Sequence, residues 1–373
     1  MLWPAWRWRL PRSLLDDGRY APFPSRREGF KRVLFLSERD PICLAQIFPF
    51  FLFAREFTDR YRIEMRELPL RIFLENRHPY SGAVDAVCFQ TWFDLAPSEM
   101  ESLCRRIKLE WPDATIAYLD WFAPIDMRFA EVLNGYIQAY VKKQILRDLN
   151  SYGGVTLGDT NLTDFYARRF HIDLPEKRFP VPEEFKRKLV MGWGFEYSSQ
   201  ILNILKQPWS FRGRSIDLQA RIATEGTDWY SRMRQEAQAK AAELDGRFKV
   251  AHRGRLSNPQ YLAELRNSKM CFSPFGYGEV CWRDFEAMST GALLIKPDMS
   301  HLRLANDFFR AYETYVPLAW DLHDLAEKID YYVHHPKERK TIARNAVELL
   351  SRRYRRNAFL KHTVPLWQLL GLN

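Results

Sequence analysis

Glycine, arginine and glutamate residues within one stretch of the sequence, 273–291, have the spacing expected of a phosphate-binding site. Gly276 and Gly278 predict a turn directly after a short apolar run. Arg283 and Glu286 lie three residues apart, so they share one face of the helix predicted after that turn. A guanidinium suits the oxygens of a diphosphate, and a carboxylate can accept both hydroxyls of a ribose. The stretch therefore predicts a site for a nucleoside diphosphate.

The elements around this turn form one strand–helix–strand unit. The apolar runs at 269–272 and 292–295 predict short buried strands, and 279–290 predicts a helix that a glycine follows. In a parallel sheet this unit places the N-terminus of the helix at the carboxyl edge, where free N–H groups and the helix dipole favour a phosphate. An alternative stays open, because Glu279 and Arg283 are four residues apart and such pairs commonly only support a surface helix.

The same stretch resembles the nucleotide-sugar motif of exostosin-like and related group 1 glycosyltransferases, which have the GT-B fold. The resemblance covers roughly the last 160 of the 373 residues. The strings that carry it are Gly276-Tyr-Gly, Arg283-Asp-Phe-Glu-Ala, Gly291, Tyr315-Val-Pro, Trp320-Asp-Leu-His-Asp-Leu-Ala-Glu-Lys-Ile and Pro336-Lys-Glu-Arg-Lys-Thr-Ile-Ala. It implies an α/β protein with two Rossmann-like domains that face each other across a cleft. It also implies transfer of a sugar from a nucleotide-sugar, held by the second domain, to an acceptor hydroxyl.

The resemblance also indicates which residues contact the donor. They are Gly276, Tyr277, Gly278, Glu279, Arg283 and Glu286. We add Arg253, which follows a strand predicted at 248–252 and would reach the same sheet edge, although a solvated basic loop explains it equally. The commoner retaining members have two glutamates eight residues apart. Glu279 precedes Glu286 by seven, so the two-glutamate mechanism is not transferred.

Carboxylates that follow predicted strands in the first half are candidates for the catalytic base. An inverting sugar transfer needs a carboxylate or an imidazole to take the proton of the acceptor hydroxyl. Asp120 follows a strand at 115–119 and is the first candidate, Asp40 follows a strand at 32–37, and Asp126 lies in the same loop as Asp120. The alternative for each is a loop or helix cap, which aspartate supplies routinely.

The sequence contains no pattern typical of a metal or cofactor site. It has no Asp-x-Asp string, no phosphate-binding GxxxxGK[ST] loop, and no set of histidine, cysteine and acidic residues with metal-ligand spacing. We therefore expect no cofactor beyond the nucleotide-sugar substrate. The helix dipole and arginines, rather than a cation, would stabilise the leaving diphosphate.

Composition restricts the class of protein. At 373 residues, with 46% hydrophobic and 15% aromatic residues, the chain can form two domains with large cores. Its five cysteines are scattered and odd in number, which is typical of reduced thiols in a cytoplasmic protein. No apolar run reaches the ~18 residues that a membrane-spanning helix needs, and arginines interrupt the apolar N-terminus, so we expect no signal peptide.

The net charge of +10 lies at the two ends of the chain. Residues 1–32 carry +5 and residues 337–361 carry +7, so the remainder sums to −2. Trp3, Trp6 and Trp8 alternate with arginines in the first of these segments. Such an arm suits packing on its own domain, an anionic membrane surface, or stacking on nucleic-acid bases. A neutral middle is unlike a continuous phosphate track, so nucleic acid is not the expected partner.

These observations give four expected regions. They are a basic, tryptophan-rich arm at 1–30, an N-terminal acceptor domain at 31–207, a nucleotide-sugar-binding domain at 208–354, and a segment at 355–373 that returns to the first domain. The expected acceptor is a surface glycan or lipid-linked glycan in polysaccharide biosynthesis, reached by a peripheral protein on the cytoplasmic side of the membrane. A nucleic-acid-binding protein and a carbohydrate-binding relative without catalysis are the alternatives.

Overall fold

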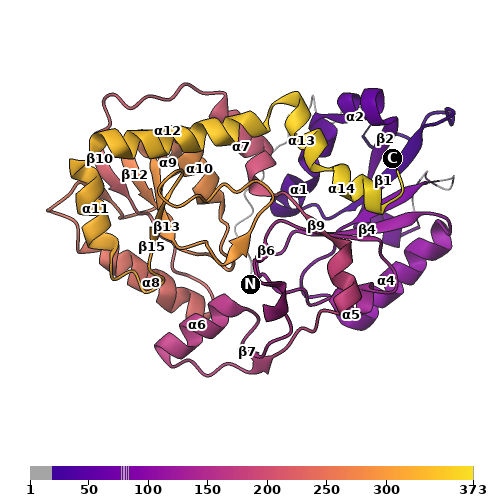
Figure 1. Ribbon diagram of the computed structural model, residues 1–373, viewed down its shortest axis with the longest axis horizontal. Coiled ribbons are helices and arrows are strands. Elements are labelled where there is room, and N and C mark those ends of the chain that lie inside the picture. The colour runs from indigo at the N-terminus through magenta and orange to yellow at the C-terminus, as the bar shows by residue number, and fades with distance from the viewer. Residues whose placement is uncertain (1–18, 77, 79, 81, 83, 373) are drawn as a thin grey trace.

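The protein has two α/β lobes, each built on a parallel sheet (Figure 1). The computed structural model describes residues 19–76, 78, 80, 82 and 84–372, so most of the predicted arm, with its three tryptophans, lies outside the described residues. The first sheet has the strand order β2-β1-β3-β4-β5-β9, and the second has the order β11-β10-β12-β13-β15. Every strand pairing within these two sheets is parallel. The predicted α/β class with two parallel-sheet domains is confirmed.

The first lobe alternates strands and helices along residues 31–142. Its elements are β1 (Lys31–Ser37), α1 (Pro41–Leu52), α2 (Ala54–Tyr61), β2 (Ile63–Pro69), α3 (Leu70–Leu74), β3 (Ala86–Phe89), α4 (Pro97–Glu110), β4 (Thr115–Asp120), α5 (Ala130–Leu133) and β5 (Ala139–Lys142), with β9 (Leu189–Met191) added later at the edge. All residues of β3 and β5 are buried. That is expected, since helices cover both faces of a parallel sheet.

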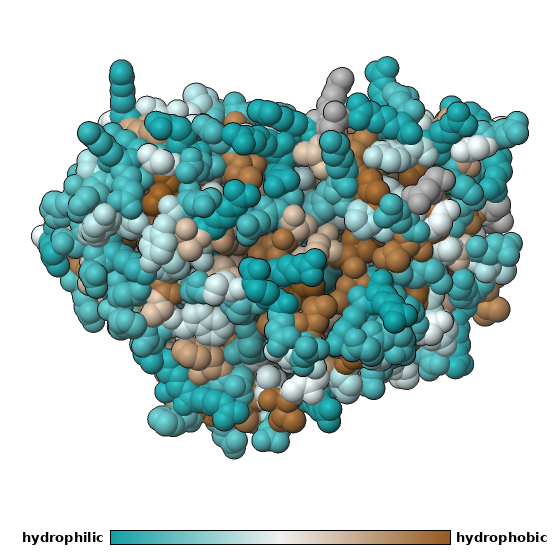
Figure 2. Space-filling view, in the orientation of Figure 1, coloured by the Kyte–Doolittle hydropathy of each residue, from teal (hydrophilic) through white to brown (hydrophobic). Residues whose placement is uncertain are grey.

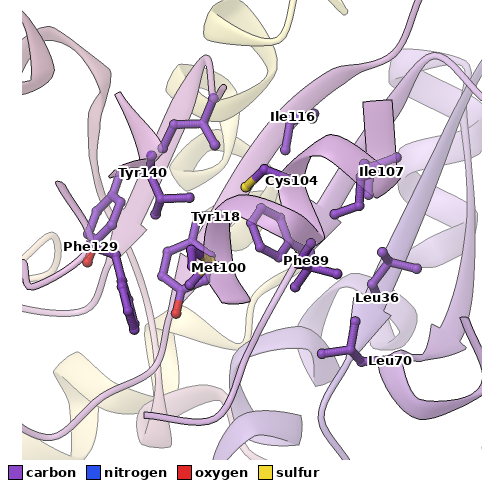
Figure 3. Close-up of a cluster of buried hydrophobic side chains, with 14 of the residues drawn as sticks. Leu36, Leu70, Phe89, Met100, Cys104, Ile107, Ile116, Tyr118, Phe129 and Tyr140 are labelled. Carbon is purple, nitrogen blue, oxygen red and sulfur yellow. The ribbon is translucent and has the colours of Figure 1, made fainter. Parts of the chain in front are cut away.

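The core under one face of the first sheet is mostly aromatic and aliphatic. Tyr118 and Phe89 on neighbouring strands lie with ring centroids 5.0 Å apart, and Tyr140 lies 5.5 Å from Tyr118. Met100 and Cys104 of α4 reach the same cluster (Figure 3). Aromatic pairs at this separation add about 0.5–1.5 kcal/mol beyond their buried area.

The second lobe repeats the pattern. Its elements are β10 (Ile216–Gln219), α8 (Asp228–Ala242), β11 (Val250–Ala251), α9 (Asn258–Arg266), β12 (Ser268–Phe272), α10 (Trp282–Thr290), β13 (Leu293–Pro297), β15 (Val316–Leu318), α11 (Leu325–His334) and α12 (Pro336–Arg353). The helix predicted from residue 279 begins at Trp282, three residues later. It ends as expected at Gly291, whose φ of +73° is the left-handed conformation that glycine adopts without strain.

The chain between β5 and β10 passes back and forth between the lobes. Short elements here are β6 (Ile145–Leu146), a 3-10 turn (Leu149–Ser151), β7 (Thr156–Leu157), α6 (Asn161–Phe170), β8 (Glu176–Lys177), 3-10 turns at Glu183–Lys188 and Phe195–Tyr197, and α7 (Ser199–Leu205). β6 pairs antiparallel with β14 (Leu302–Arg303) of the second lobe. α6 lies beside α8, and α7 packs on α10 (Figure 1). The two lobes are therefore joined by backbone hydrogen bonds and by helices that cross between them.

The end of the chain crosses to the first lobe. After α12, the helices α13 (Arg356–His362) and α14 (Val364–Leu369) lie over α2 and β5 (Figure 1). Phe359 and Trp367 are buried against Phe50, with ring centroids 5.2 and 5.7 Å away. The C-terminal helices thus complete the core on the second face of the first sheet.

The surface is largely polar, with apolar side chains gathered near the middle of the face where the lobes meet (Figure 2). Within the part of the chain that the structure describes, no helix combines the length and apolarity needed to cross a membrane.

Candidate functional site

The loop 273–281 connects β12 to α10 at the carboxyl edge of the second sheet, as the sequence predicted. Gly278 lies against the first lobe so closely that a Cβ there would be 2.0 Å from the carbonyl oxygen of Ala123. No Cβ atom is tolerated below 3.0 Å, so only glycine fits this contact. The N–H of Gly276 donates to the carbonyl of Gly278 at 3.0 Å. These glycines tighten the turn and let the two lobes approach.

Glu279 lies in this loop and not on the helix, which corrects the pairing with Arg283 considered from the sequence. Its side chain is fully buried and its carboxylate receives three hydrogen bonds. Gln144 donates at 2.8 Å, Asn161 at 3.3 Å, and His301 lies at 3.3 Å. Because Gln144 and Asn161 come from the crossing segment, Glu279 connects that segment to the second lobe.

The N-terminus of α10 already holds an anion, the carboxylate of Asp284. This side chain accepts from the N–H of Cys281 at 2.8 Å and from the hydroxyl of Ser273 at 2.6 Å, and lies 3.2 Å from the ammonium of Lys296. Burial raises the pKa of Asp284, while the charge of Lys296 lowers it. A phosphate at this N-terminus would share it with this carboxylate, and the phosphate site there stays a prediction.

Arg283 is placed differently, on the side of α10 that faces the loop after β10. Its guanidinium donates to the carbonyl of Arg221 and contacts the hydroxyl of Tyr261. The Nη1 atom is buried and has no hydrogen-bond partner among the described residues, and none of their carboxylates lies within 4.0 Å of this guanidinium. A buried donor without a partner costs about 1–3 kcal/mol, which an anionic ligand would offset.

Glu286 lies one turn further along α10 and is nearly buried. Its two oxygens accept from the amide of Gln200 at 2.6 Å and from the hydroxyl of Tyr261 at 3.1 Å. Burial raises its pKa, and the charge of Arg283 lowers it. A carboxylate held in this way by two neighbours is fixed in orientation, and each oxygen keeps one lone pair for a further donor.

Tyr277 and Arg253 occupy the outer part of this edge. The ring of Tyr277 stacks on Tyr230 with centroids 4.3 Å apart, and its hydroxyl accepts from the N–H of Thr227 at 3.0 Å. Arg253 is exposed and lies 3.6 Å from Asp245, so it extends into solvent as the solvated-loop interpretation expects.

Sequence reasoning missed a second arginine at this edge. Arg234 of α8 is buried and donates to the carbonyls of Ala223 and Phe275, at 2.5 and 2.7 Å, without a carboxylate within 4.0 Å. In the sequence, nothing distinguishes Arg234 from the other arginines that lie in helices. Together with the partly buried Arg283 it gives the edge two cations that have no carboxylate of the described residues within ion-pairing distance.

The first-lobe aspartates have structural partners. Asp120 is fully buried, with its carboxylate 2.6 Å from the ammonium of Lys142, 2.5 Å from the hydroxyl of Tyr140 and 2.8 Å from the N–H of Phe122. Such a group cannot meet an acceptor hydroxyl, so the assignment of Asp120 as the base is corrected. Asp40 caps α1 by accepting from the N–H of Ile42 at 2.8 Å.

Asp126, the third aspartate considered, is likewise engaged. It holds the guanidinium of Arg128 through two hydrogen bonds of 2.8 and 2.7 Å. The cap and loop alternatives therefore explain all three aspartates.

Two buried ionisable residues at the junction of the lobes, Glu196 and Lys143, were not predicted from the sequence. Burial raises the pKa of Glu196 to about 7, and burial together with the charge of Lys142 lowers the pKa of Lys143 to about 8. Glu196 accepts from the N–H of Gly194 at 3.0 Å, and both side chains line a small cavity with Asn306. No motif marks these residues, because they are 53 positions apart and are brought to one sheet edge by the pairing of β5 with β9.

Comparison with solved structures supports the class that this architecture indicates. An alpha-glucosyltransferase in complex with UDP and a 13-mer DNA containing a HMU base superposes with a TM-score of 0.50 at 9% identity, over 91% of this chain and 99% of that one. A glycosyltransferase from Rickettsia africae ESF-5 aligns with a TM-score of 0.47 at 12% identity, over 92% and 99% of the two chains. The fold is GT-B, as the resemblance implied.

The match to a known family lies in the second half of the chain. Residues 212–363 match the family model described as "Glycosyl transferase-like". The resemblance of the C-terminal part to glycosyltransferases is therefore confirmed. A comparison with curated proteins gives no match. Among the described residues, no group of three or more histidine, cysteine or acidic side chains is arranged to hold a metal ion.

Proposed function

We propose that the protein is a glycosyltransferase that moves a sugar from a nucleotide-sugar to an acceptor hydroxyl, with the donor at the carboxyl edge of the second sheet. The observation that carries this proposal is the Nη1 atom of Arg283, which is buried without a hydrogen-bond partner in a glycosyltransferase-like domain, while none of the described carboxylates lies within 4.0 Å of the guanidinium. A diphosphate would supply the missing acceptor and a closer negative charge than Glu286 provides. The alpha-glucosyltransferase was solved in complex with UDP, so UDP and UDP-sugars are the first ligands to test here.

Within this proposal, Glu286 contacts the donor ribose and Tyr277 borders the donor at the outer edge. Gln200 and Tyr261 hold Glu286 in one orientation, which suits recognition of a pair of hydroxyls. Gly276, Gly278 and Glu279 would act through the shape of the loop rather than by touching the donor. Arg253, being exposed, would contribute charge only.

Glu196 is a better candidate for the base than Asp120. It lies at the junction of the lobes, and a pKa of about 7 is near the value at which a general base works best. Glu196→Gln should lower kcat while the affinity for nucleoside diphosphate stays unchanged. A variant with normal kcat would exclude Glu196 as the base.

Arg283→Lys tests the donor site. Lysine keeps the charge but loses the fork of parallel N–H donors, so we expect about tenfold weaker binding of UDP or another nucleoside diphosphate, and unchanged binding of the nucleoside. Isothermal titration calorimetry measures both. The matched control is Arg255→Lys, an exposed arginine of the same edge that pairs with Glu225 at 2.7 Å. Equal losses for nucleotide and nucleoside, or for both variants, would contradict the assignment.

The donor base and sugar can be found by a thermal-shift screen against UDP, GDP, CMP and their sugars. A ligand at 100 times its dissociation constant stabilises the fold by about 2.7 kcal/mol. Transfer assays with the best donor, run with and without excess chelator, then test independence of metal ions. Loss of transfer in chelator with recovery on adding manganese would overturn that part of the proposal.

The proposed acceptor is a surface glycan or a lipid-linked glycan at an anionic membrane. The support is the basic segment 337–361, which follows α12 and α13 from the second lobe to the first (Figure 1). Each basic residue near anionic lipid contributes about 1 kcal/mol. Co-sedimentation with anionic vesicles at low and high salt tests this, and DNA containing the HMU base serves as the competing acceptor in the transfer assay. Failure to bind vesicles even at low salt would exclude the membrane surface.

A further inference from the structure

A second cationic site lies at the amino edge of the second sheet, on the opposite side from the donor loop. A cavity of about 200 Å³ opens here between the start of β10, the start of β12 and the face of α12. Arg214, Lys269, Arg339 and Lys340 line it, and Phe211 forms part of its wall. Pockets for drug-sized ligands measure roughly 300–1,000 Å³, so this cavity suits a smaller molecule.

The charge in this cavity is only partly compensated by the protein, through Asp217. Among the described residues, Lys269 has an ion pair, with Asp217 at 2.6 Å, while Arg214, Arg339 and Lys340 have no carboxylate within 4.0 Å. Burial and the charge of Arg339 lower the pKa of the Arg214 guanidinium to about 10, still far above neutrality. Two arginines are thus held close enough to repel each other inside a partly buried site.

Backbone contacts fix the orientation of these cations. The guanidinium of Arg214 donates to the carbonyls of Ser210, Ser268 and Thr290 at 2.8, 2.5 and 2.5 Å, which uses three of its five N–H groups. Arg339 donates to the carbonyls of Tyr332 and Val333. Carbonyl oxygens orient an arginine without neutralising it, so both groups keep positive charge and free donors for a ligand.

The cavity and the proposed donor site are separate. Lys269 is the second residue of β12, and the donor loop starts at Ser273, four residues further along the strand. At about 3.3 Å per residue the two positions are ~13 Å apart along the sheet. A ligand in the cavity would contact α12 and the strand starts, and would not reach Arg283.

We propose that this cavity binds a small phosphate-bearing anion, such as inorganic phosphate or a phosphomonoester. The geometry that points to it is a cavity lined by four cations, of which only Lys269 has an ion pair among the described residues, since arginine and lysine together suit a tetrahedral dianion. The site also accounts for part of the basic segment 337–361, because Arg339 and Lys340 of α12 line the cavity. The proposal stands independently of the function assigned to the donor site.

The test compares two lysines of α12. Lys340→Gln removes a cation that lines the cavity, and Lys337→Gln removes an exposed lysine of the same helix that does not. Titrating inorganic phosphate by calorimetry, at constant ionic strength set with chloride, should show saturable binding to the parent protein. We expect about tenfold weaker binding to the Lys340 variant and unchanged binding to the Lys337 variant.

Two further binding experiments determine where the phosphate binds and whether it belongs to a lipid. Arg283→Lys should leave phosphate binding unchanged, because the donor site is elsewhere; a loss in this variant would mean that phosphate occupies the donor site and would overturn the proposal. Vesicles containing phosphatidic acid present the same phosphomonoester on a lipid, so binding of these vesicles that Lys340→Gln weakens, without binding of free phosphate, assigns the site to a headgroup. If neither ligand distinguishes the Lys340 variant from the Lys337 variant, the cavity is not a phosphate site.

Discussion

The carboxyl edges of the two sheets differ in how fully their charges are paired, although each contains one buried ion pair, that of the second edge being Asp284 with Lys296 at 3.2 Å. At the first edge, Asp120 and Lys142 are both fully buried and neutralise each other at 2.6 Å. At the second edge, Arg234 and Arg283 are held by carbonyls and have no acid within 4.0 Å among the described residues. Buried charges are normally paired. The two arginines of the second edge are therefore where a ligand of opposite charge is expected, and the Asp120–Lys142 pair of the first edge is part of the scaffold.

Asp120→Asn should have the largest effect on the paired edge. It leaves the ammonium of Lys142 buried without a counter-charge, which typically costs 3–5 kcal/mol. Chemical denaturation should show this loss of unfolding free energy. Asp40→Ala is the matched control at the same edge, where loss of a helix cap costs only ~1 kcal/mol. An equal loss of unfolding free energy in the two variants would mean that Asp120 and Lys142 do not form a buried ion pair.

Glu196→Gln tests the junction between the two lobes through the pH dependence of the unfolding free energy. Its pKa of about 7 lies above the ordinary 4.5, so the folded state holds the proton more tightly than the unfolded state does. The stability that this group contributes is complete below about pH 4.5 and is lost as the pH rises to 7.

Glutamine does not titrate, so the variant should gain stability relative to the parent across that window, approaching ~3 kcal/mol at about 1.4 kcal/mol per pKa unit. Thermal or urea unfolding at several pH values below 7, where Lys143 is still charged, measures this. A difference that does not change with pH would show that Glu196 is already ionised in the folded protein at low pH.

Gly278→Ala tests the contact between the edges. The added methyl cannot fit beside the carbonyl of Ala123, so the loop or the lobe must shift, at about 1–3 kcal/mol. Gly276→Ala is the milder control, because its methyl would meet the Sγ of Cys281 at 3.2 Å. Both unfolding free energy and nucleotide affinity should fall in the Gly278 variant. Normal behaviour of this variant would indicate that the lobes separate readily in solution.

Elements with local signals could be predicted from the sequence. The buried strands β1, β4, β12 and β13 followed from apolar runs, and the helix α10 followed from its position between two of them and from its closing glycine. β5 and β9 were missed, because each has only three consecutive apolar residues, too few for the period to distinguish a strand from a helix.

The candidate site was predictable only in part. Arg283 and Glu286 came from spacing on one helix, and the position of the donor loop followed from the order of elements. The roles of Glu279, Asp284 and Asp120 did not, because each depends on partners more than 10 residues away in the chain, such as Gln144, Lys296 and Lys142. Spacing along a helix is local information, whereas compensation of a buried charge is decided by tertiary packing.

The C-terminal helices have a consequence for how the protein is made. Trp367 of α14 is buried against Phe50 and Phe57, and the carbonyl of Leu370 accepts a hydrogen bond from the hydroxyl of Thr115 at 3.0 Å. During synthesis, domains generally fold from the N-terminus onward. Here the core of the first lobe is complete only after α13 and α14 have been synthesised, and until then the lobe exposes the apolar surface that these helices cover. Deletion of α14 would therefore destabilise the lobe that is translated first.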